Sequence, residues 1–324
     1  MSPPRLSRKR KASIHPPPIP PSSILPPPFN PIPNGRPWTI SIAIPSSIIA
    51  DLHAEAQSYT IARIARSLAI FSIDEAIVFA DCPASADHVD TIAALLAYLD
   101  CPPFMRKHLF PPIADAESLP ALDAPHHPHP KDPWIPYREA IAISTDPATS
   151  TTVVDAALDE TLSVPGIFPP STRLTLHFAD PDSAPSTVHP DVPRSKGGYY
   201  WGYSVRRSPS LSAIFTSGTD NYDLCVGISP QGATPAEAFP AEERGRRSGA
   251  PRFRRMLVVI GGDGGLETAA NNDERLRSIG IEGEKTGELF DRLVSVLPGQ
   301  GSRAVSADEL VYIALAALKN VWDI

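Results

Sequence analysis

The sequence predicts an α/β fold built on a parallel sheet, with a small all-β module inserted into it. Two patterns carry this prediction. Strand-like and helix-like segments alternate over residues 38–112 and again over residues 199–324, which is typical of parallel sheets covered by helices. Between them, residues 113–198 hold short β-like runs separated by Pro, Asp, Ser and Gly, a pattern typical of a small barrel or sandwich.

Residues 1–37 are expected to form a disordered, basic leader. Thirteen of them are proline, which lacks a donor N–H and cannot join a helix or a sheet ladder. The same segment has six Lys and Arg residues and no acid, although the whole chain carries a net charge of −7. The run Arg8–Lys11 resembles a short nuclear localisation signal, and a solvated charge cluster without function has the same composition. This leader is the basis for expecting a nuclear or nucleolar protein.

The first part of the α/β layer begins at Trp38. Residues 39–44 alternate polar and apolar side chains, as a half-buried strand does. Residues 52–71 repeat apolar side chains at helical spacing, residues 76–79 form an apolar run of the length of a buried strand, and residues 87–99 again fit a helix. The order strand, helix, strand, helix is the beginning of a parallel sheet.

Prolines and histidines interrupt this pattern at residues 111–136. His126, His127 and His129 lie in that stretch, but prolines adjoin them and no cysteine accompanies them, so we expect no metal site. The expected strands of the inserted module are residues 139–144, 151–154, 161–164 and 172–178. The α/β pattern resumes near Tyr199. Its expected elements are a helix at 208–215, strands at 222–226 and 256–260, a helix at 288–293, a strand at 294–297 and a final helix at 306–318.

Composition excludes several classes of protein. Apolar residues make up 42% of the chain, enough for a sizeable core, and no window approaches the roughly 18 uninterrupted apolar residues of a membrane helix. The three cysteines, Cys82, Cys101 and Cys225, are scattered, which suggests neither a disulfide framework nor a paired metal site. Neither GxSxG nor HExxH is present, so the sequence gives no support for a hydrolase. We expect a soluble intracellular protein without a membrane partner.

Three glycine-rich loops follow the apolar runs of the second α/β part. They are residues 227–232 (GISPQG), 261–267 (GGDGGLE) and 298–303 (PGQGSR). Ligands of parallel α/β sheets lie outside the carboxyl ends of the strands, and glycine allows close approach of the backbone to a ligand. The loops therefore indicate a nucleotide-like pocket, with tight turns that hold no ligand as the alternative. No lysine follows the glycines as in a P-loop, and their late position disfavours a Rossmann dinucleotide site.

At this point the sequence resembles the SPOUT class of RNA methyltransferases, in particular its eukaryotic and archaeal branch. The order GISPQG, LVVIGGDGGLE and LPGQGSR before a terminal helix is similar to the SPOUT cofactor site. Residues 64–74 (IARSLAIFSID) are similar to the first SPOUT motif, in which an Arg precedes a small residue and then a Phe. The segments Phe104–Lys107, Asp123–His127 and Gly198–Arg206 also resemble this branch. The likeness covers about residues 38–318.

The resemblance implies a SPOUT fold with a C-terminal trefoil knot, an inserted OB-like barrel, a homodimer, and S-adenosyl-L-methionine bound by the three loops. The residues it places at the cofactor are Gly227, Ile228, Ser229, Gln231, Gly232, Gly261, Gly262, Gly265, Leu266, Ser295, Val296, Pro298, Gly299, Gly301 and Ser302. The chain departs from the family at Ile228 and Gln231, where Thr and Arg are usual, and at Ser295-Val296, where Asn-Thr is usual. These changes lower cofactor affinity little if the cofactor is contacted by main-chain groups.

Arg66 aligns with the SPOUT motif arginine, and the resemblance implies a catalytic role near the methyl acceptor; its alternative is a surface ion pair. Arg303 is a candidate for a cofactor carboxylate or an RNA phosphate. The aromatic run 199–201 lies beside four basic residues, which fits RNA stacking or, more commonly, a core position. The basic segment 244–255 is a candidate RNA-binding loop or a solubilising one.

These observations predict an S-adenosylmethionine-dependent RNA methyltransferase acting on ribosomal RNA, with a uridine base nitrogen as the expected acceptor. Two alternatives remain at this point. One is a non-catalytic RNA- or spindle-associated scaffold that keeps the knotted fold, which the departures at Ile228, Gln231 and Val296 favour. The other is a dinucleotide-dependent oxidoreductase.

Overall fold

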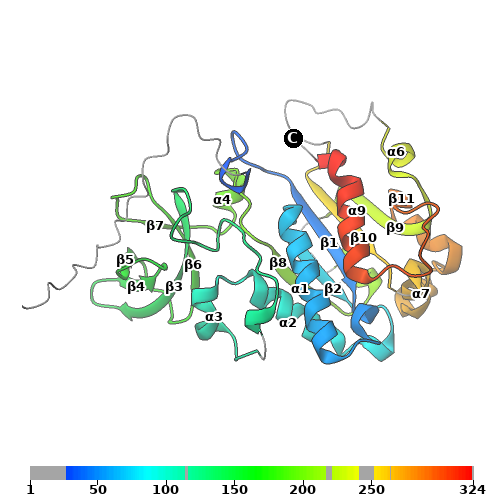
Figure 1. The fold of residues 1–324 in the computed structure, drawn as a ribbon, viewed down its shortest axis with the longest axis horizontal. Helices are drawn as coiled ribbons and strands as arrows, with labels where there is room; N and C mark the ends of the chain where they lie inside the picture. The colour runs from blue at the N-terminus through cyan, green and yellow to red at the C-terminus, as the bar shows by residue number, and fades with distance from the viewer. Residues whose placement is uncertain (1–26, 114–115, 217–220, 241–251, 263, 323–324) are drawn as a thin grey trace, which may run out of the picture.

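The computed structural model describes residues 27–113, 116–216, 221–240, 252–262 and 264–322. It contains a six-stranded parallel sheet and a separate five-stranded antiparallel sheet (Figure 1). The strands of the parallel sheet, in spatial order, are β11 (Arg292–Val294), β9 (Leu224–Ala233), β10 (Arg255–Ile260), β1 (Thr39–Pro45), β2 (Glu75–Phe79) and β8 (Ser204–Ser208). The predicted α/β class with a parallel sheet is confirmed.

Helices cover both faces of the parallel sheet. One face carries α1 (Ala54–Ile70), α2 (His88–Asp100), α6 (Pro235–Ala238) and α9 (Ala307–Trp322). The other carries α5 (Leu211–Thr216), α7 (Gly265–Asn272) and α8 (Glu274–Ser278). The short helices α3 (Pro103–Leu109) and α4 (Val192–Ser195) lie outside these layers, as do 3₁₀ turns at Pro27–Phe29, Ser46–Ile49, Pro83–Ser85, Ala116–Ser118 and Gly283–Leu289.

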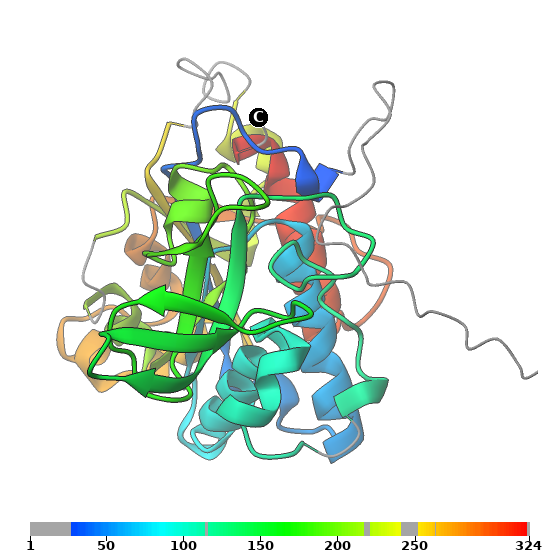
Figure 2. The ribbon, with the colours of Figure 1, turned by 90° about the vertical axis from the view of Figure 1, so that its left-hand side faces the viewer.

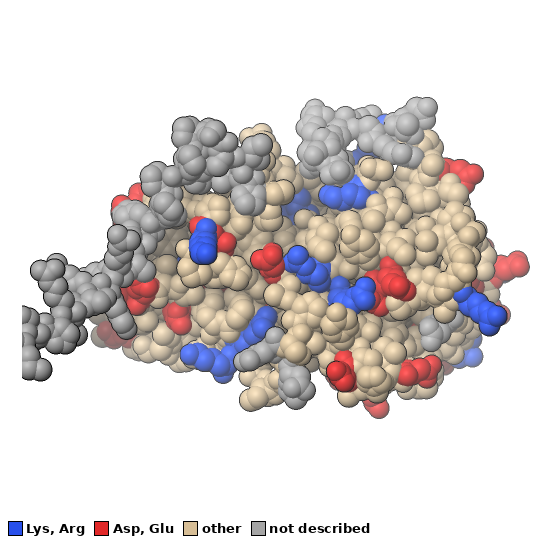
Figure 3. Space-filling view, in the orientation of Figure 1, with Lys and Arg blue, Asp and Glu red and all other residues tan. Residues whose placement is uncertain are grey.

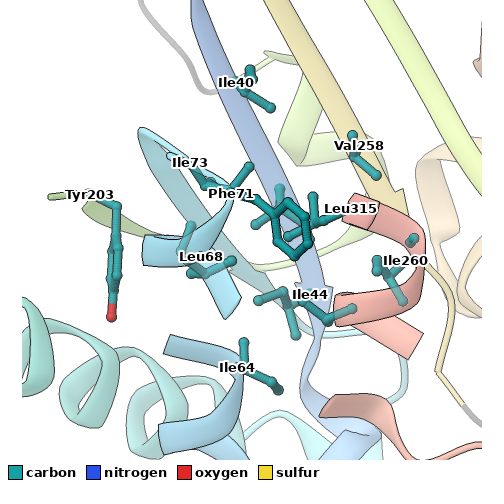
Figure 4. Close-up of a cluster of buried hydrophobic side chains, with 14 of the residues drawn as sticks. Ile40, Ile44, Ile64, Leu68, Phe71, Ile73, Tyr203, Val258, Ile260 and Leu315 are labelled. Atoms are coloured by element: carbon teal, nitrogen blue, oxygen red, sulfur yellow. The ribbon is translucent and has the colours of Figure 1, made fainter. Parts of the chain in front are cut away.

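The core lies on both sides of β1, as the period of two in its sequence requires. Ile40, Ile42 and Ile44 point to the face covered by α1 and α9, whereas Ala43 points to the face covered by α7. Ile64 and Leu68 of α1 meet Leu315 of α9 over these strands (Figure 4). Burial of these branched side chains fixes which face of each strand meets each helix layer.

The inserted module is a curled antiparallel sheet with the order β5-β4-β3-β6-β7 (Figure 2). Its strands are β3 (Tyr137–Asp146), β4 (Thr151–Asp155), β5 (Leu162–Pro165), β6 (Arg173–His177) and β7 (Ser186–Val188). The four predicted runs correspond to β3, β4, β5 and β6. β7 was not predicted, because three residues between prolines carry too little pattern. A small apolar core, with Val154 and Leu176 fully buried, fills the concave side of this sheet.

Buried charges join the two sheets. Asp100, at the end of α2, accepts a hydrogen bond from Arg173 of β6 at 3.0 Å and another from the main-chain N–H of Tyr203 at 3.0 Å. Glu139 of β3 pairs with the same arginine and accepts the indole N–H of Trp201 at 2.7 Å. Because each carboxylate has charged and neutral donors, its burial is compensated, and the module is held against the parallel sheet.

Three elements differ from the sequence-based expectation. Residues 27–37, expected within the disordered leader, pack on the body, where the N–H of Ile32 donates to the carbonyl of Gly198 at 3.0 Å. β8 was not predicted, because its arginines hide the strand pattern. The predicted helix at 288–293 is wrong: Asp291 pairs with Cys225 through its main-chain N–H at 2.9 Å and its carboxylate at 2.7 Å. That pairing starts β11 in place of a helix.

Candidate functional site

The three glycine-rich segments come together at the carboxyl ends of β9, β10 and β11. Ile228 lies opposite Ile260 in the register of β9 and β10, so the first two segments begin side by side. Leu293 pairs with Gly227, but the next residue, Val294, pairs with Ala233. Residues 228–232 therefore leave the ladder as a bulge next to the third segment. The first segment is thus part of β9, although a loop was expected after residue 226.

The bulge is held by its own side chains. Ser229 is buried, and its hydroxyl forms a short hydrogen bond to the side-chain oxygen of Gln231. The main-chain N–H of Gln231 donates to the same hydroxyl at 3.3 Å. Ile228, one of the departures from the family pattern, packs into the core. Its side chain serves packing, so any contact of residue 228 with a ligand comes from the main chain.

Two glycines of the site are required by the chain itself. A Cβ on Gly232 would meet the main-chain N of Val294 at 2.4 Å, so only glycine lets β9 and β11 approach this closely. A Cβ on Gly262 would overlap the hydroxyl of Ser47 and lie 2.6 Å from a carboxylate oxygen of Asp81. Gly262 therefore lies close to the residues that follow β1 and β2. That Gly262 also lies close to a ligand stays a prediction.

Asp81 is a buried carboxylate directly behind the second glycine-rich segment. It accepts hydrogen bonds from the main-chain N–H of Ser47 at 3.0 Å, the hydroxyl of Ser85 at 3.2 Å and the hydroxyl of Ser46 at 3.3 Å. The Ser47 hydroxyl also donates to it. Sequence reasoning missed this cluster. The available signal was an acid just beyond the apolar run 76–79, at the carboxyl end of a predicted strand.

The third segment offers its main chain. Residues 298–299 form a turn, and within the described chain no main-chain hydrogen bond joins residues 296–301 to another segment, although the main-chain N–H of Ser295 donates to the carbonyl of Ala233 at 2.8 Å. Nothing lies within 4 Å of a Cβ built on Gly299 or Gly301. Pro298, Ser302 and Arg303 are exposed. A ligand that takes its hydrogen bonds from main-chain groups fits these residues. Such a ligand would be little affected by the side chains at residues 228, 231, 295 and 296, where this sequence departs from the family pattern.

Some of the remaining predicted cofactor residues pack in the core, and others lie at the edge of the site. A Cβ on Gly227 would lie 3.0 Å from the side chain of Leu266, a fully buried residue of α7. Gly261 and Gly265 touch each other, because a Cβ on Gly261 would lie 2.8 Å from the carbonyl carbon of Gly265. Gly265 has φ +73°, which explains glycine at the start of α7. Val296 packs against the core beside α9.

Arg66 lies at the opposite end of the sheet from the glycine-rich segments. α1 begins after the carboxyl end of β1 and returns towards its amino end, so its last turns lie near Trp38 and Ser72. The guanidinium of Arg66 donates to the carbonyl of Leu122. No carboxylate among the described residues forms an ion pair with it, so the surface ion pair considered as an alternative is not found there.

Trp201 and two of the candidate histidines have structural roles. Trp201 is buried and bonded to Glu139, which places it in the core. The Nε2 atoms of His126 and His127 lie 3.0 Å and 2.7 Å from the carbonyl oxygen of Asp100. The described residues contain no group of three or more His, Cys, Asp or Glu that suits a metal ion.

The charged segments give less direct information. Arg8–Lys11 and most of the basic segment 244–255 lie outside the described residues. On the face covered by α1 and α9, the described Lys and Arg side chains alternate with Asp and Glu and form no large basic patch (Figure 3). No helix in the described ranges has both the length and the apolar character needed to cross a membrane.

Comparison with known proteins gives the family. Residues 39–318 match the family described as "Putative RNA methyltransferase". The chain is 35% identical to the human 28S rRNA (uridine-N(3))-methyltransferase, over 88% of this chain and 79% of the human protein. It is 32% identical to the mouse protein of that name, over 88% and 77%, and 34% identical to the fruit-fly one, over 88% and 62%. The chain therefore belongs to this family of RNA methyltransferases.

Proposed function

We propose that this enzyme transfers a methyl group from S-adenosyl-L-methionine to N3 of a uridine in ribosomal RNA of the large subunit. The observation that carries the proposal is the 35% identity over most of the chain to a human protein named for that reaction. The meeting of three glycine-rich segments at one sheet edge agrees with it. The alternatives of a scaffold and of an oxidoreductase have no such support.

The main chain of residues 228–232, 261–262, 264–265 and 295–302 is the proposed cofactor-binding surface. Main-chain amides and carbonyls of the third segment that bond to no other segment would bind the adenine and ribose, while Ser229 and Ser295 are buried next to them. When bound, the sulfonium supplies an activated methyl group for in-line displacement. N3 of uridine must lose a proton for this transfer, and a nearby guanidinium favours the resulting anion. Arg66 is the proposed source of that charge.

The position of Arg66 is the reason for proposing a homodimer. Within one chain it lies at the amino end of the sheet, whereas the cofactor segments lie at the carboxyl end. A second copy must therefore bring the two together if Arg66 acts in the transfer. The exposed faces of α1 and α9 offer a surface for that copy: Tyr59, Ile70 and Tyr312 are between 46% and 50% exposed.

The knot and the OB-like module are also proposals. The connection from β9 towards β10 contributes Ala238 and Phe239 to the face covered by α9, while α7 and α8 cover the other face. After β11 the chain returns to the first face and enters α9, the path that a threaded C-terminus requires. In the inserted module the edge strands β5 and β7 approach each other, as in a partly closed five-stranded barrel.

The reaction is tested by mass spectrometry of nucleosides from ribosomal RNA of cells with and without the gene. We expect loss of N3-methyluridine and its return on incubation with the purified enzyme and S-adenosylmethionine. Unchanged N3-methyluridine would refute the assignment of the substrate. Calorimetry with S-adenosylhomocysteine tests the cofactor separately. Nuclear or nucleolar placement, proposed from Arg8–Lys11, is tested by imaging a fluorescent fusion with and without residues 1–26.

The shared site is tested by mixing two inactive variants. Arg66→Ala lacks the guanidinium but keeps the cofactor segments, and Gly262→Val lacks cofactor binding but keeps Arg66. A heterodimer of the two contains one complete site, so we expect about half of the wild-type activity per dimer. Heterodimers as inactive as the two parents would show that Arg66 does not act across a subunit boundary. Circular dichroism of each variant verifies folding.

A further inference from the structure

The carboxyl ends of β1 and β10 lie side by side, but the chain leaves them in opposite directions. The two strands pair in parallel, with Ala43 opposite Val259 near their ends. After β1 the chain passes to α1 on one face of the sheet, whereas after β10 it passes to α7 on the other face. In open α/β sheets, ligands bind outside the carboxyl ends of the strands at such a point. Because neither connection crosses from one strand end to the other, direct contacts must fix the two ends relative to each other.

Ser47, which follows β1, makes such a contact with Gly262, which follows β10. A Cβ built on Gly262 would overlap the Ser47 hydroxyl and lie 2.6 Å from Oδ2 of Asp81. The main chain of Gly262 therefore lies directly against the hydroxyl and the carboxylate. Gly262 does not have a positive φ, so this contact, and not the backbone conformation, requires glycine here.

The two carboxylate oxygens of Asp81 have different partners. Oδ1 accepts three hydrogen bonds from residues that follow β1 and β2: from the main-chain N–H of Ser47 at 3.0 Å, the hydroxyl of Ser85 at 3.2 Å and the hydroxyl of Ser46 at 3.3 Å. Oδ2 accepts the Ser47 hydroxyl and is the oxygen that lies against Gly262. Hydrogen bonds to an ionised group are stronger than neutral ones, and a buried network whose members are paired is rigid. Oδ1 therefore anchors the carboxylate, and Oδ2 with the Ser47 hydroxyl forms a fixed surface for the second glycine-rich segment.

Asp81 also contacts the far end of the helix that this segment begins. α7 starts at Gly265 and ends at Asn272, whose side-chain amide donates to the main-chain carbonyl of Asp81 at 3.0 Å. One residue thus contacts the chain just before α7 and again at its last residue. The second segment is held between these two contacts, and it cannot shift along the sheet edge without breaking one of them.

We propose that Ser47 and Asp81 are positioning residues for the methyl donor, acting through the main chain of Gly262. The inference rests on the proposed function, because it takes residues 261–262 as part of the cofactor-binding surface. Main-chain groups cannot adjust as a side chain can, so any displacement of the segment also displaces the groups that the cofactor contacts. A misplacement of about 1 Å is enough to weaken a binding or catalytic site. Ser47 and Asp81 prevent that displacement at the second segment.

A matched pair of serine variants tests the proposal. Ser47→Ala removes the hydroxyl that lies between Oδ2 of Asp81 and Gly262, and Ser85→Ala removes a hydroxyl that donates to Oδ1. Each variant deletes one hydroxyl bonded to the same carboxylate, so we expect similar losses of the free energy of unfolding in urea. Calorimetry with S-adenosylhomocysteine should show about 3- to 10-fold weaker binding to Ser47→Ala, with Ser85→Ala within about twofold of the wild type.

Kinetics of the same variants separate the two substrates. Ser47→Ala should raise KM for S-adenosylmethionine and leave KM for RNA unchanged, because the RNA does not depend on the position of Gly262. Wild-type cofactor affinity in Ser47→Ala would overturn the positioning role. Equal losses of affinity in Ser47→Ala and Ser85→Ala would overturn it too, since general destabilisation produces that result.

A double-mutant cycle with Gly262→Ala tests whether the residues act through one contact. The added methyl group overlaps the Ser47 hydroxyl in the wild type, but Ser47→Ala lacks that oxygen. We therefore expect Gly262→Ala to weaken S-adenosylhomocysteine binding at least about threefold more in the wild-type background than in the Ser47→Ala background. Equal losses in the two backgrounds would refute the contact. A wild type that binds no S-adenosylhomocysteine would refute the proposed cofactor site and this inference with it, whereas coupling in an enzyme that methylates no ribosomal RNA would support the positioning role and refute the proposed substrate.

Discussion

His127 makes the stability of this protein depend on pH. It is buried between α2 and the loop at residues 122–125, and its Nε2–H donates to the carbonyl oxygen of Asp100 at 2.7 Å. Burial, and then the charge of His126, lower the pKa of His127 from 6.5 to about 3. Asp100 and Arg106 are the other charged groups that face it. The folded protein therefore keeps this imidazole neutral at pH 7.

The sign and size of the effect follow from linkage. Below pH 6.5 the unfolded chain binds a proton at His127, while the folded chain does not until about pH 3. The contribution of this group to stability is thus present above pH 6.5 and is lost as the pH falls towards 3. Between pH 7 and pH 5 the unfolded state gains about 2 kcal/mol from this proton. That is a large share of the 5–15 kcal/mol typical of a folded protein.

Urea denaturation at pH 7, 6 and 5 measures this loss. We expect the wild type to lose at least about 2 kcal/mol, and His127→Gln, which keeps a donor but does not titrate, to lose about 2 kcal/mol less. His129→Gln is the matched control, because the His129 side chain is 61% exposed in the same loop region. If His127→Gln and His129→Gln show the same dependence on pH, the buried neutral imidazole is not its source.

Three further changes are expected to separate packing from binding. Gly262→Val should lower S-adenosylmethionine affinity at least about tenfold in calorimetry, because its side chain displaces the Asp81 cluster behind the site, whereas Gly287→Ala, which lies outside the proposed cofactor surface and meets its nearest atom at 3.8 Å, should bind normally. Asp81→Ala should lower the free energy of unfolding by about 2–3 kcal/mol, since it removes the buried carboxylate to which three serine hydroxyls and the main-chain N–H of Ser47 donate; an unchanged urea midpoint would contradict this. Arg173→Met should cost about 3 kcal/mol by leaving two buried carboxylates uncompensated, and a smaller loss on acidification to pH 3 would agree with that cause.

The sequence was sufficient for the strands whose pattern is strong. β2 and β10 are apolar runs buried on both faces, and their burial dominates every other local preference. β1 was predicted from its alternation as a half-buried strand, and it is a strand, but it is buried on both faces, Ser41 included. β8 could not be found in this way, because Arg206 reads as a surface residue until its pairing with Glu75 of β2 at 2.8 Å is known. The formation of β8 depends on long-range pairing, which no local sequence pattern contains.

The candidate site was predictable in part for the same reason. The meeting of the glycine-rich segments follows from parallel strands, whose carboxyl ends share one edge. The contact of Gly262 with Asp81 depends on how β10 and β2 flank β1, which the sequence does not contain. A groove at the amino end of the sheet, lined by Arg66 and Trp322 among others, was not predicted, because its parts, α1, α9 and residues 27–32, are far apart along the chain.

The place of β1 within the sheet has a consequence for biosynthesis. The N-terminal strand is not at an edge: Thr39 pairs with Arg255 on one side, and Ser41 pairs with Glu75 on the other. While the ribosome is still translating, β1 and β2 exist without β10, and one side of β1 offers unpaired amides and carbonyls to other chains. Nascent protein is therefore exposed to aggregation until residues 255–260 have left the ribosome, and its folding should be slow and dependent on chaperones.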